Sequence, residues 1–569
     1  MRLPLSPMLL SVLALSACAG PNPPDPGAKG YARQWYVDNQ SPCQQVCGSE
    51  QAPFPRIQDA IARLQPGDEV IIAGHDDAPY LEWLNLPKLD RSPSPTPPTL
   101  IRGWKGMPKP IIRGSLPQKG WRATRYPNTY VTVWDLVPAD APDAILEPQQ
   151  VYRGNTPLQQ VGGLVFGGYP KRKHPDLTHE EIWPSRLPER EVGALQPNQF
   201  MFDREAKALY VKLDSPLKTD PSSGTVKETL DISVRHYMAV NNVAYRVNNL
   251  TLQSLVFERS ATAHYWRGGA IMLAGNNNTL DQLVVQDMDS FCVQLSGDNN
   301  TLQNSVIQRC GQGGLSASGR NLTVSGNQFL YNNTRRFNPY WEAGAMKFVA
   351  TPPITGARIT NNTVAHTVLG DGIWFDTFQD DNLIANNRVA YNEGIGIHIE
   401  VSNRAQIEHN IIVGNAAQGI QLVDSNGSTM TGNILVGNVQ DGILIQDDTR
   451  AQQQPAYRSK NNRINKNTFA WNWELARDRN YRPFAMPDGN PLQGNAYCGT
   501  GVGNPPSVHF VVNNVVHDWA SWSKAGHEKQ GSHQMGTPPV ELLRRLQERD
   551  LSLLSDPATL LGYIKKHCR

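Results

Sequence analysis

The sequence is poor in charge and in long apolar runs. Only 18% of its 569 residues are charged and the formal net charge is +2, which excludes a strongly basic nucleic-acid binder and an acidic disordered chain. Low charge together with 47 Gly and 43 Pro argues against coiled coils and helical bundles. After residue 15 no apolar run reaches the length of a membrane-spanning helix. No set of Cys and His has the spacing of a zinc site, so we expect no metal ligands.

The first residues are typical of an export signal. Arg2 precedes the apolar stretch 9–15, as in secretory signals. The segment Leu15–Cys18 (Leu-Ser-Ala-Cys) resembles the bacterial lipobox, which implies that residues 1–18 are a lipoprotein signal peptide and that Cys18 is lipidated. By the same resemblance, Ala19 implies an outer-membrane lipoprotein facing the periplasm or the cell surface. The Pro-rich residues 19–35 predict an extended tether.

Six cysteines remain, and an exported protein can join them as disulfides. Cys43 and Cys47 are close enough for a small loop bridge. Cys498 and Cys568 are candidates for a bridge that ties the C-terminal tail down. Cys292 and Cys310 lie among the repeats, where we expect buried thiols. Spacing alone does not fix the connectivity.

Asparagine is the residue in excess, and its positions repeat. Of 44 Asn, 38 lie between Asn241 and Asn514. Asn-x-aliphatic segments recur at intervals of 23, 35, 25, 23, 23 and 34 residues, and Gly-Ile segments accompany them at intervals of 24, 23 and 23. The Asn segments begin at Asn304, Asn327, Asn362, Asn387, Asn410, Asn433 and Asn467, and the Gly segments at Gly372, Gly396, Gly419 and Gly442. Two strand signals in each period of ~23 residues predict an all-β solenoid, a right-handed parallel β-helix, whose repeated Asn stack at one turn.

The period divides the chain. Residues 36–114 are predicted to form an N-terminal cap and the first coils, with a helix over 57–64 that covers the open edge. The period is lost over 115–234, which predicts an inserted β module. Parallel β-helix repeats are expected over 235–516. Residues 517–569 have helical spacing near their end and are expected to cap the last coil.

Alternation of side chains along the strands places polar residues in outward columns. One column contains Lys347, Trp374, His398 and Gln421, and its neighbour contains Asp376 and Glu400 on adjacent coils. Adjacent coils lie ~4.8 Å apart, which suits the ~5–5.5 Å carboxylate spacing of retaining glycoside hydrolases.

The neighbours of this carboxylate pair have predicted roles. Two carboxylates this close favour one proton shared between them, and Lys347 and His398 would set which one keeps it. Trp374 would stack on a sugar face. Asp371 and Asp441 lie in turns, where we expect structural roles.

The same residues carry a family resemblance. Segments 341–348, 372–376 (Gly-Ile-Trp-Phe-Asp) and 399–402 (Ile-Glu-Val-Ser) resemble bacterial right-handed β-helix proteins, and more narrowly β-helical glycoside hydrolases of the β-xylosidase type within the pectate-lyase-like superfamily. The resemblance implies that Asp376 is the nucleophile, that Glu400 is the acid/base, and that the inserted module is β-sandwich-like. The sequence departs from that pattern at Thr377 and at 403–404 (Asn-Arg).

Three functions therefore stay open. The first is a lipid-anchored, monomeric glycoside hydrolase that needs no cofactor; its further substrate-binding candidates are Tyr340, Glu342 and Arg404. The second is a lyase or C5-epimerase of uronic-acid polymers, in which Lys347 or His398 is the base and Ca²⁺ is a possible cofactor. The third is a non-catalytic glycan-binding surface protein. All three have a carbohydrate partner, and none has a nucleic acid.

Overall fold

A computed structural model describes most of the chain. The described residues are 30–90, 97–136, 147–162, 164–165, 185–186, 190–241, 245–261, 268–337, 343–349, 351–472, 484–499, 510–554 and 557–568. The predicted signal peptide with Cys18, most of the tether, Tyr340 and Glu342 lie outside these residues.

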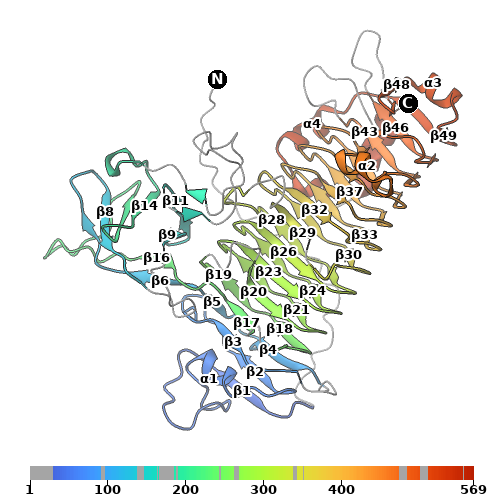
Figure 1. The fold of residues 1–569 in the computed structure, drawn as a ribbon. Coiled ribbons are helices and arrows are strands. Elements are labelled where there is room, and N and C mark those ends of the chain that lie inside the picture. The colour runs from blue at the N-terminus through green and yellow to red at the C-terminus, as the bar shows by residue number, and fades with distance from the viewer. Residues whose placement is uncertain are drawn as a thin grey trace.

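The chain winds into a parallel β-helix whose three long faces are sheets of short strands (Figure 1). The 14-stranded sheet comprises β1 (Gln34–Val37), β2 (Glu69–Ile72), β4 (Thr99–Gly103), β18 (Leu250–Gln253), β21 (Thr279–Asp281), β24 (Thr301–Gln303), β27 (Thr323–Ser325), β30 (Arg358–Thr360), β33 (Leu383–Ala385), β36 (Gln406–Glu408), β39 (Thr429–Thr431), β42 (Arg463–Asn465), β45 (Leu492–Gln493) and β49 (Glu528–Lys529).

The 13-stranded sheet comprises β3 (Leu84–Leu86), β17 (Ala239–Asn241), β20 (Gly269–Ala274), β23 (Phe291–Ser296), β26 (Gly313–Ser318), β29 (Gly344–Phe348), β32 (Asp371–Asp376), β35 (Ile397–Glu400), β38 (Ile420–Val423), β41 (Ile443–Gln446), β44 (Phe484–Met486), β47 (Phe510–Val512) and β48 (Val515–His517). The 12-stranded sheet comprises β5 (Ile111–Arg113), β19 (Val256–Glu258), β22 (Val284–Gln286), β25 (Val306–Gln308), β28 (Gln328–Leu330), β31 (Thr363–Ala365), β34 (Arg388–Ala390), β37 (Ile411–Val413), β40 (Ile434–Val436), β43 (Thr468–Ala470), β46 (Ala496–Gly499) and β50 (Ser532–Met535). The predicted all-β, right-handed parallel β-helix is confirmed.

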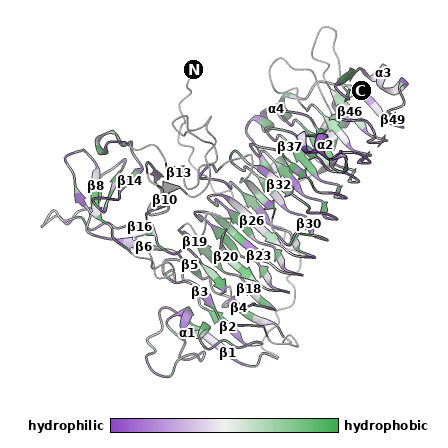
Figure 2. Ribbon diagram, viewed as in Figure 1, coloured by the Kyte–Doolittle hydropathy of each residue, from purple (hydrophilic) through white to green (hydrophobic). Residues whose placement is uncertain are grey.

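Inside the coils, aliphatic side chains stack from one coil to the next. Ile373, Ile397, Ile420 and Ile443 follow each other in register and are fully buried. Figure 2 shows apolar residues concentrated in the strands and polar residues in the connections between them. Burial of this continuous apolar column is the main favourable term for the fold, since each buried aliphatic side chain contributes about 1.5–3 kcal/mol.

The repeated asparagines form two buried ladders, where the sequence predicted one. In the first ladder each side-chain amide donates to the Oδ1 atom of the next Asn at 2.9–3.1 Å, through Asn327, Asn362, Asn387, Asn410, Asn433, Asn467 and Asn495. A second ladder joins Asn392, Asn415, Asn438 and Asn472 in the same way. Because the same amides also bond backbone atoms of neighbouring coils, the ladders satisfy turn groups that would otherwise be buried without partners.

The chain between β5 and β17 forms small sheets that stand beside the β-helix and are antiparallel except for the parallel pair β11–β14 (Figure 1). Their elements are β6 (Ser115–Gln118), β7 (Arg122–Ala123), β8 (Thr129–Val133), β9 (Val151–Arg153), β10 (Thr156–Pro157), β11 (Gln159–Gln160), β12 (Leu164–Val165), β13 (Ser185–Arg186), η1 (Val192–Ala194), β14 (Gln199–Asp203), β15 (Ala208–Lys212) and β16 (Leu230–Ser233). Strands β6, β8, β9, β14, β15 and β16 share an apolar core of their own that includes Trp121, Phe200 and Leu230. Arg335 fastens them to the coils: it donates to the Gln149 carbonyl at 2.9 Å and pairs with buried Asp289.

Helices occur near both ends of the chain and in one loop between coils. They are α1 (Ile57–Ile61), α2 (Thr449–Gln453), η2 (Pro455–Tyr457), α3 (Trp519–Lys524), α4 (Val540–Gln547), η3 (Leu551–Leu554) and α5 (Pro557–His567). The first helix packs on the first coil but ends three residues earlier than the predicted 57–64. No helix in the described ranges is long and apolar enough to cross a bilayer.

Of the C-terminal segment that the sequence predicted to cap the last coil, only α3 does so. Trp522 of α3 packs into the end of the coil interior, but α4 and α5 lie along the outside of the 12-stranded sheet. The reason is that the outward positions of this sheet are apolar there, and the helices cover them. The residues in contact include Ala390, Ile411, Val413, Val436, Ala470, Leu542, Leu546, Leu560 and Ile564.

All six cysteines are paired. Disulfides join Cys43 to Cys47 and Cys498 to Cys568. The expectation of buried thiols at Cys292 and Cys310 is wrong, because these residues lie within the same coil and form a third disulfide. The Cys498–Cys568 bridge fixes the end of α5 to β46.

Candidate functional site

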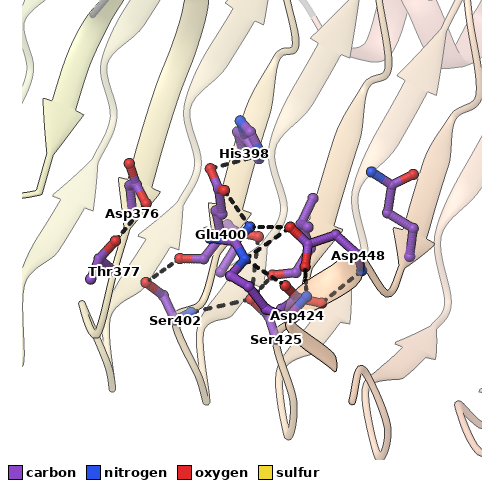
Figure 3. Close-up of polar contacts among 12 residues, drawn as sticks. Asp376, Thr377, His398, Glu400, Ser402, Asp424, Ser425 and Asp448 are labelled. Carbon is purple, nitrogen blue, oxygen red and sulfur yellow. Dashed lines mark hydrogen bonds and ion pairs between the residues drawn. The ribbon is translucent and has the colours of Figure 1, made fainter. Parts of the chain in front are cut away.

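The outward columns of the 13-stranded sheet bring the predicted site residues together. Lys347 is in register with Trp374, Trp374 with His398, and His398 with Gln421. In the neighbouring column Asp376 is in register with Glu400. Figure 3 shows Asp376, His398 and Glu400 rising from adjacent strands on the same side of the sheet. The side chains of Asp376 and Glu400 keep 14% and 18% of their surface exposed.

Lys347 points outward from the sheet, but its side chain is fully buried. Its Nζ atom lies 3.1 Å from Asp376 Oδ2 and 2.9 Å from the centroid of the Trp374 ring. The other face of that ring stacks on His398, with centroids 4.8 Å apart and planes 16° apart. Both faces of Trp374 are therefore occupied by its column neighbours, and the prediction that it stacks on a sugar is wrong. Residues one coil apart along a column are at stacking distance of each other.

Asp371 belongs to the site, although the sequence suggested a purely structural role. Its Oδ1 atom accepts from the Ile395 backbone N–H at 2.7 Å, as expected of a turn residue, but its Oδ2 atom lies 2.9 Å from His398 Nδ1. This contact orients the imidazole, whose Nε2 atom lies 3.9 Å from Glu400 Oε2. His398 Nε2 is buried and has no hydrogen-bond partner among the described residues. The arrangement is a carboxylate–imidazole–carboxylate series that ends at Glu400.

Arg450 holds the other oxygen of Glu400. Its Nη2 atom donates to Glu400 Oε1 at 2.6 Å, and its Nε atom donates to Asp424 Oδ2 at 2.9 Å and to Asp448 Oδ2 at 2.8 Å. Figure 3 labels the three carboxylates. Asp448 also caps α2 by accepting from the Arg450 backbone N–H. One guanidinium is thus shared by three carboxylates.

Asp424 and Asp448 titrate as a pair. Burial, together with the hydrogen bond and charge of Asp448, raises the pKa of Asp424 to about 6. Burial alone would raise the pKa of Asp448 too, but hydrogen bonds from Asp424 and Arg450 outweigh it and lower that pKa to about 2. Between about pH 2 and pH 6 the pair as a whole therefore carries one proton.

A cleft of about 590 Å³ opens beside these residues. Its lining includes Asp371, Trp374, Glu393, His398, Glu400, Gln418, Gln421, Val423, Gln440, Gln446, Asp448 and Arg450. Glu400 lines it, whereas Asp376 and Lys347 are not among its lining residues; the cleft starts at the coil of β32, with Asp371 and Trp374, and extends past Glu400 toward later coils. Its size falls in the range of about 300–1,000 Å³ that ligand pockets occupy.

Arg404 does not join this group. It pairs with Asp381 at 2.6 Å and with Asp380 at 3.1 Å, it is half exposed, and it is absent from the cleft lining. The prediction that it binds substrate is therefore not supported by its position, because the two aspartates of the preceding coil engage its guanidinium. In the described ranges no group of three or more His, Cys, Asp and Glu is placed to hold a metal ion.

The sequence did not predict a role for Arg450 or for the glutamines that line the cleft. The interval of 34 residues between Asn433 and Asn467 was a signal for the first, since it exceeds the period by 11 residues. The extra length forms α2 and η2, which carry Arg450 over the edge of the sheet. Gln421 was placed in its column, but no role was predicted for it.

The fold and the comparisons define a right-handed parallel β-helix protein. The family described as "Right handed beta helix region" matches residues 354–476. The solved structure described as "The complex structure of XylC with xylose" is 14% identical, with a TM-score of 0.56, over 85% of this chain and 86% of that one.

Two further solved structures are less similar. A structure described as "Glycoside hydrolase" is 8% identical, with a TM-score of 0.44, over 89% of this chain and 96% of that one. The A-module of the Azotobacter vinelandii mannuronan C-5 epimerase AlgE6 is 15% identical, with a TM-score of 0.36, over 51% of this chain and 74% of that one. No curated protein matches the sequence. These likenesses concern the fold.

Proposed function

We propose that the protein is a carbohydrate-active enzyme, a glycoside hydrolase that uses two carboxylates and retains the anomeric configuration. The observation that carries the proposal is the register of Asp376 with Glu400 on adjacent parallel strands, both partly exposed at the same face. Strand spacing of ~4.8 Å brings the two carboxyl groups into the range used by retaining enzymes. Two such groups stacked without a function would repel each other at a cost in stability.

In this mechanism Asp376 is the nucleophile. The ammonium group of Lys347 compensates its negative charge, and Thr377 Oγ1 donates to its Oδ1 atom at 2.8 Å. These two contacts hold the carboxylate in one orientation. Its oxygen attacks the anomeric carbon while Glu400 gives a proton to the leaving oxygen, and the glycosidic bond breaks as the glycosyl ester forms. Water deprotonated by Glu400 then hydrolyses the ester. The proton taken from water leaves Glu400 protonated for the next turnover, and His398, fixed by Asp371, lies 3.9 Å from its Oε2 atom.

The lyase or C5-epimerase alternative has one observation in its favour. Asp371 orients His398 as a base needs to be oriented. Such chemistry also needs a cation for the sugar carboxylate, but Arg335 is paired with Asp289, and Arg404 is paired with Asp380 and Asp381. A product that absorbs in the ultraviolet would identify a lyase and reject the hydrolase.

The decisive experiment is a screen of plant and bacterial glycans with analysis of product anomers. We expect the wild-type protein to release sugars with retained configuration, and Asp376→Asn and Glu400→Gln to lower kcat by about 1,000-fold or more while melting like the wild type. Glu408→Gln is the matched control, because Glu408 lies in β36 of the 14-stranded sheet and is in register with Ala385 and Thr431 rather than with an acid. Glycan binding without turnover, unchanged in both site variants, would instead identify a non-catalytic binding protein.

We further propose that Cys18 carries a lipid that anchors a monomeric protein to the outer membrane. The support is the lipobox-like segment before Cys18 and the Pro-rich stretch after it. Cells fed a labelled fatty acid should label the wild type and not Cys18→Ser, and only the wild type should sediment with outer membranes. Protease treatment of whole cells then distinguishes a surface from a periplasmic location. Label retained on Cys18→Ser would reject the anchor.

A further inference from the structure

The cleft takes in the acid of the carboxylate pair but not the nucleophile. Its lining starts at the coil of β32, with Asp371 and Trp374, includes Glu400 and continues over the coils of β38 and β41, but it does not include Asp376. In a two-carboxylate hydrolase the attacked sugar sits over the nucleophile, and the leaving oxygen lies against the acid. A cleft that is lined by the acid and not by the nucleophile, and that continues over the following coils, therefore lies where the leaving group would be.

Gln421 in the cleft floor has an unused hydrogen-bonding amide. The residue is 8% exposed and follows His398 in the column, yet its side chain makes no hydrogen bond to any described residue. Its amide atoms are not among the buried polar atoms that lack a partner, so they face the cleft and are open to a ligand. An amide offers both donors and an acceptor, which matches a sugar hydroxyl.

The surroundings of Gln421 fit a sugar ring. Val423, in register with Glu400, gives the floor an apolar patch, and Gln446 follows it on the next coil with a second amide. The far wall is formed by Gln418 and Gln440, whose side chains bond each other at 2.7 Å.

The charges of the cleft disfavour an acidic sugar. Four carboxylates line it, Asp371, Glu393, Glu400 and Asp448, against the single guanidinium of Arg450 among the described lining residues. That guanidinium already serves Glu400, Asp424 and Asp448. A uronate carboxylate entering the cleft would meet net negative charge and no uncommitted cation, which is a repulsive contribution to specificity.

From these observations we propose that the cleft beside Glu400 is the binding subsite for the departing sugar unit, that it accepts a unit without a carboxylate, and that Gln421 recognises its hydroxyl groups. This inference rests on the proposed hydrolase function, which determines on which side of the cleaved glycosidic bond the cleft lies. The substrate is then an oligosaccharide with at least two units, one over Asp376 and the next over Gln421.

The test compares two leaving groups on the same attacked sugar. Nitrophenyl glycosides of xylose, arabinose, glucose, galactose and mannose present an aryl leaving group, and the matching oligosaccharides present a sugar. Gln421→Met keeps the volume and removes the amide. We expect it to lower the ratio of kcat/KM for the oligosaccharide to kcat/KM for the aryl glycoside by about 3- to 10-fold, the value of one hydrogen bond.

Gln406→Ala is the matched control, since Gln406 is an exposed outward glutamine of β36 in the 14-stranded sheet. Its ratio should equal that of the wild type. An unchanged ratio in Gln421→Met would overturn the role of Gln421. Preferential turnover or binding of uronate oligosaccharides over neutral ones would overturn the assigned chemistry of the subsite.

A binding measurement separates this inference from the hydrolase proposal. Neutral and uronate oligosaccharides of these sugars are titrated into the wild type and Gln421→Met. If no glycan is turned over, but a neutral oligosaccharide binds and Gln421→Met weakens it about 3- to 10-fold, the hydrolase is rejected and the subsite stands. If no oligosaccharide binds and none is turned over, both are rejected.

Discussion

Two outer faces of the same coils differ: the chain covers one of them and leaves the other open. Along the 12-stranded sheet the outward positions are apolar, and the chain covers them with its own C-terminal helices. Along the 13-stranded sheet the outward positions are Trp374, His398 and Gln421, which are polar or carry polar atoms, and a cleft is left beside them. The Nε1 atom of Trp374 and the Nε2 atom of His398 are buried without hydrogen-bond partners among the described residues.

Within one repeat, the covered face contributes to stability, whereas the open face carries the candidate functional site. Covering the 12-stranded sheet gains apolar burial, which is the ordinary use of an exposed hydrophobic surface in a folded chain. Keeping buried polar groups unsatisfied on the 13-stranded sheet costs free energy. Such groups persist where a ligand or a reaction uses them.

The largest effect is expected on the covered face. Leu542 of α4 is fully buried against the 12-stranded sheet, so Leu542→Ala should lower the free energy of unfolding by about 2–5 kcal/mol. Val540→Ala in the same helix is the control, because Val540 is 83% exposed. Urea unfolding measures both variants. Unchanged stability in Leu542→Ala, or loss of turnover while the variant is still folded, would contradict this contrast between the two faces.

On the open face, stability depends on charge pairing. Lys347→Met leaves Asp376 without its ammonium partner and should cost about 3 kcal/mol. Adding Asp376→Asn should recover part of this loss, since the remaining group is then neutral. Lys88→Met removes the exposed pair with Asp90 and should cost less than about 1 kcal/mol. Additive losses in the double variant would show that the two residues are not coupled.

We expect the free energy of unfolding to depend on pH through a histidine on the covered side. His366 stacks between Tyr331 and Tyr391, with centroids 4.7 and 5.6 Å away, and burial and Arg549 lower its pKa from 6.5 to about 4. Between these values the unfolded chain binds more protons than the folded one, so stability falls as pH drops from about 6.5 to 4, by at most about 3 kcal/mol. His366→Gln should flatten this part of the pH profile of urea unfolding. An equal slope in the variant would contradict the assignment.

Much of the fold was predictable because the strand pattern recurs in every coil, so irregular residues in one coil do not hide it. The recurrence of Asn and Gly-Ile segments indicated the coils, and strand alternation alone was enough to place Asp376 beside Glu400. The period failed where the chain leaves the coils. The packing of α4 and α5 on a side face depends on which outward positions are apolar in space, and no local pattern in residues 540–564 states this.

The site was predictable only in part for the same reason. Residues on the strands, such as His398, follow from register, whereas Arg450 reaches Glu400 from an insertion whose path the period does not describe. Asp371 was read from its turn alone, and its bond to His398 crosses to the next coil. Trp374 was expected to be available, but its neighbours along the column cover both ring faces.

By itself, the sequence determined the solenoid, its period and the columns that result, because each coil repeats the geometry of the one before it. Only the tertiary structure decided which of these outward residues are open to a ligand. The opening beside Glu400 depends on α2 and on the stacking of Lys347, Trp374 and His398. These are contacts between distant segments, and their free energies come from burial and charge pairing rather than from local alternation.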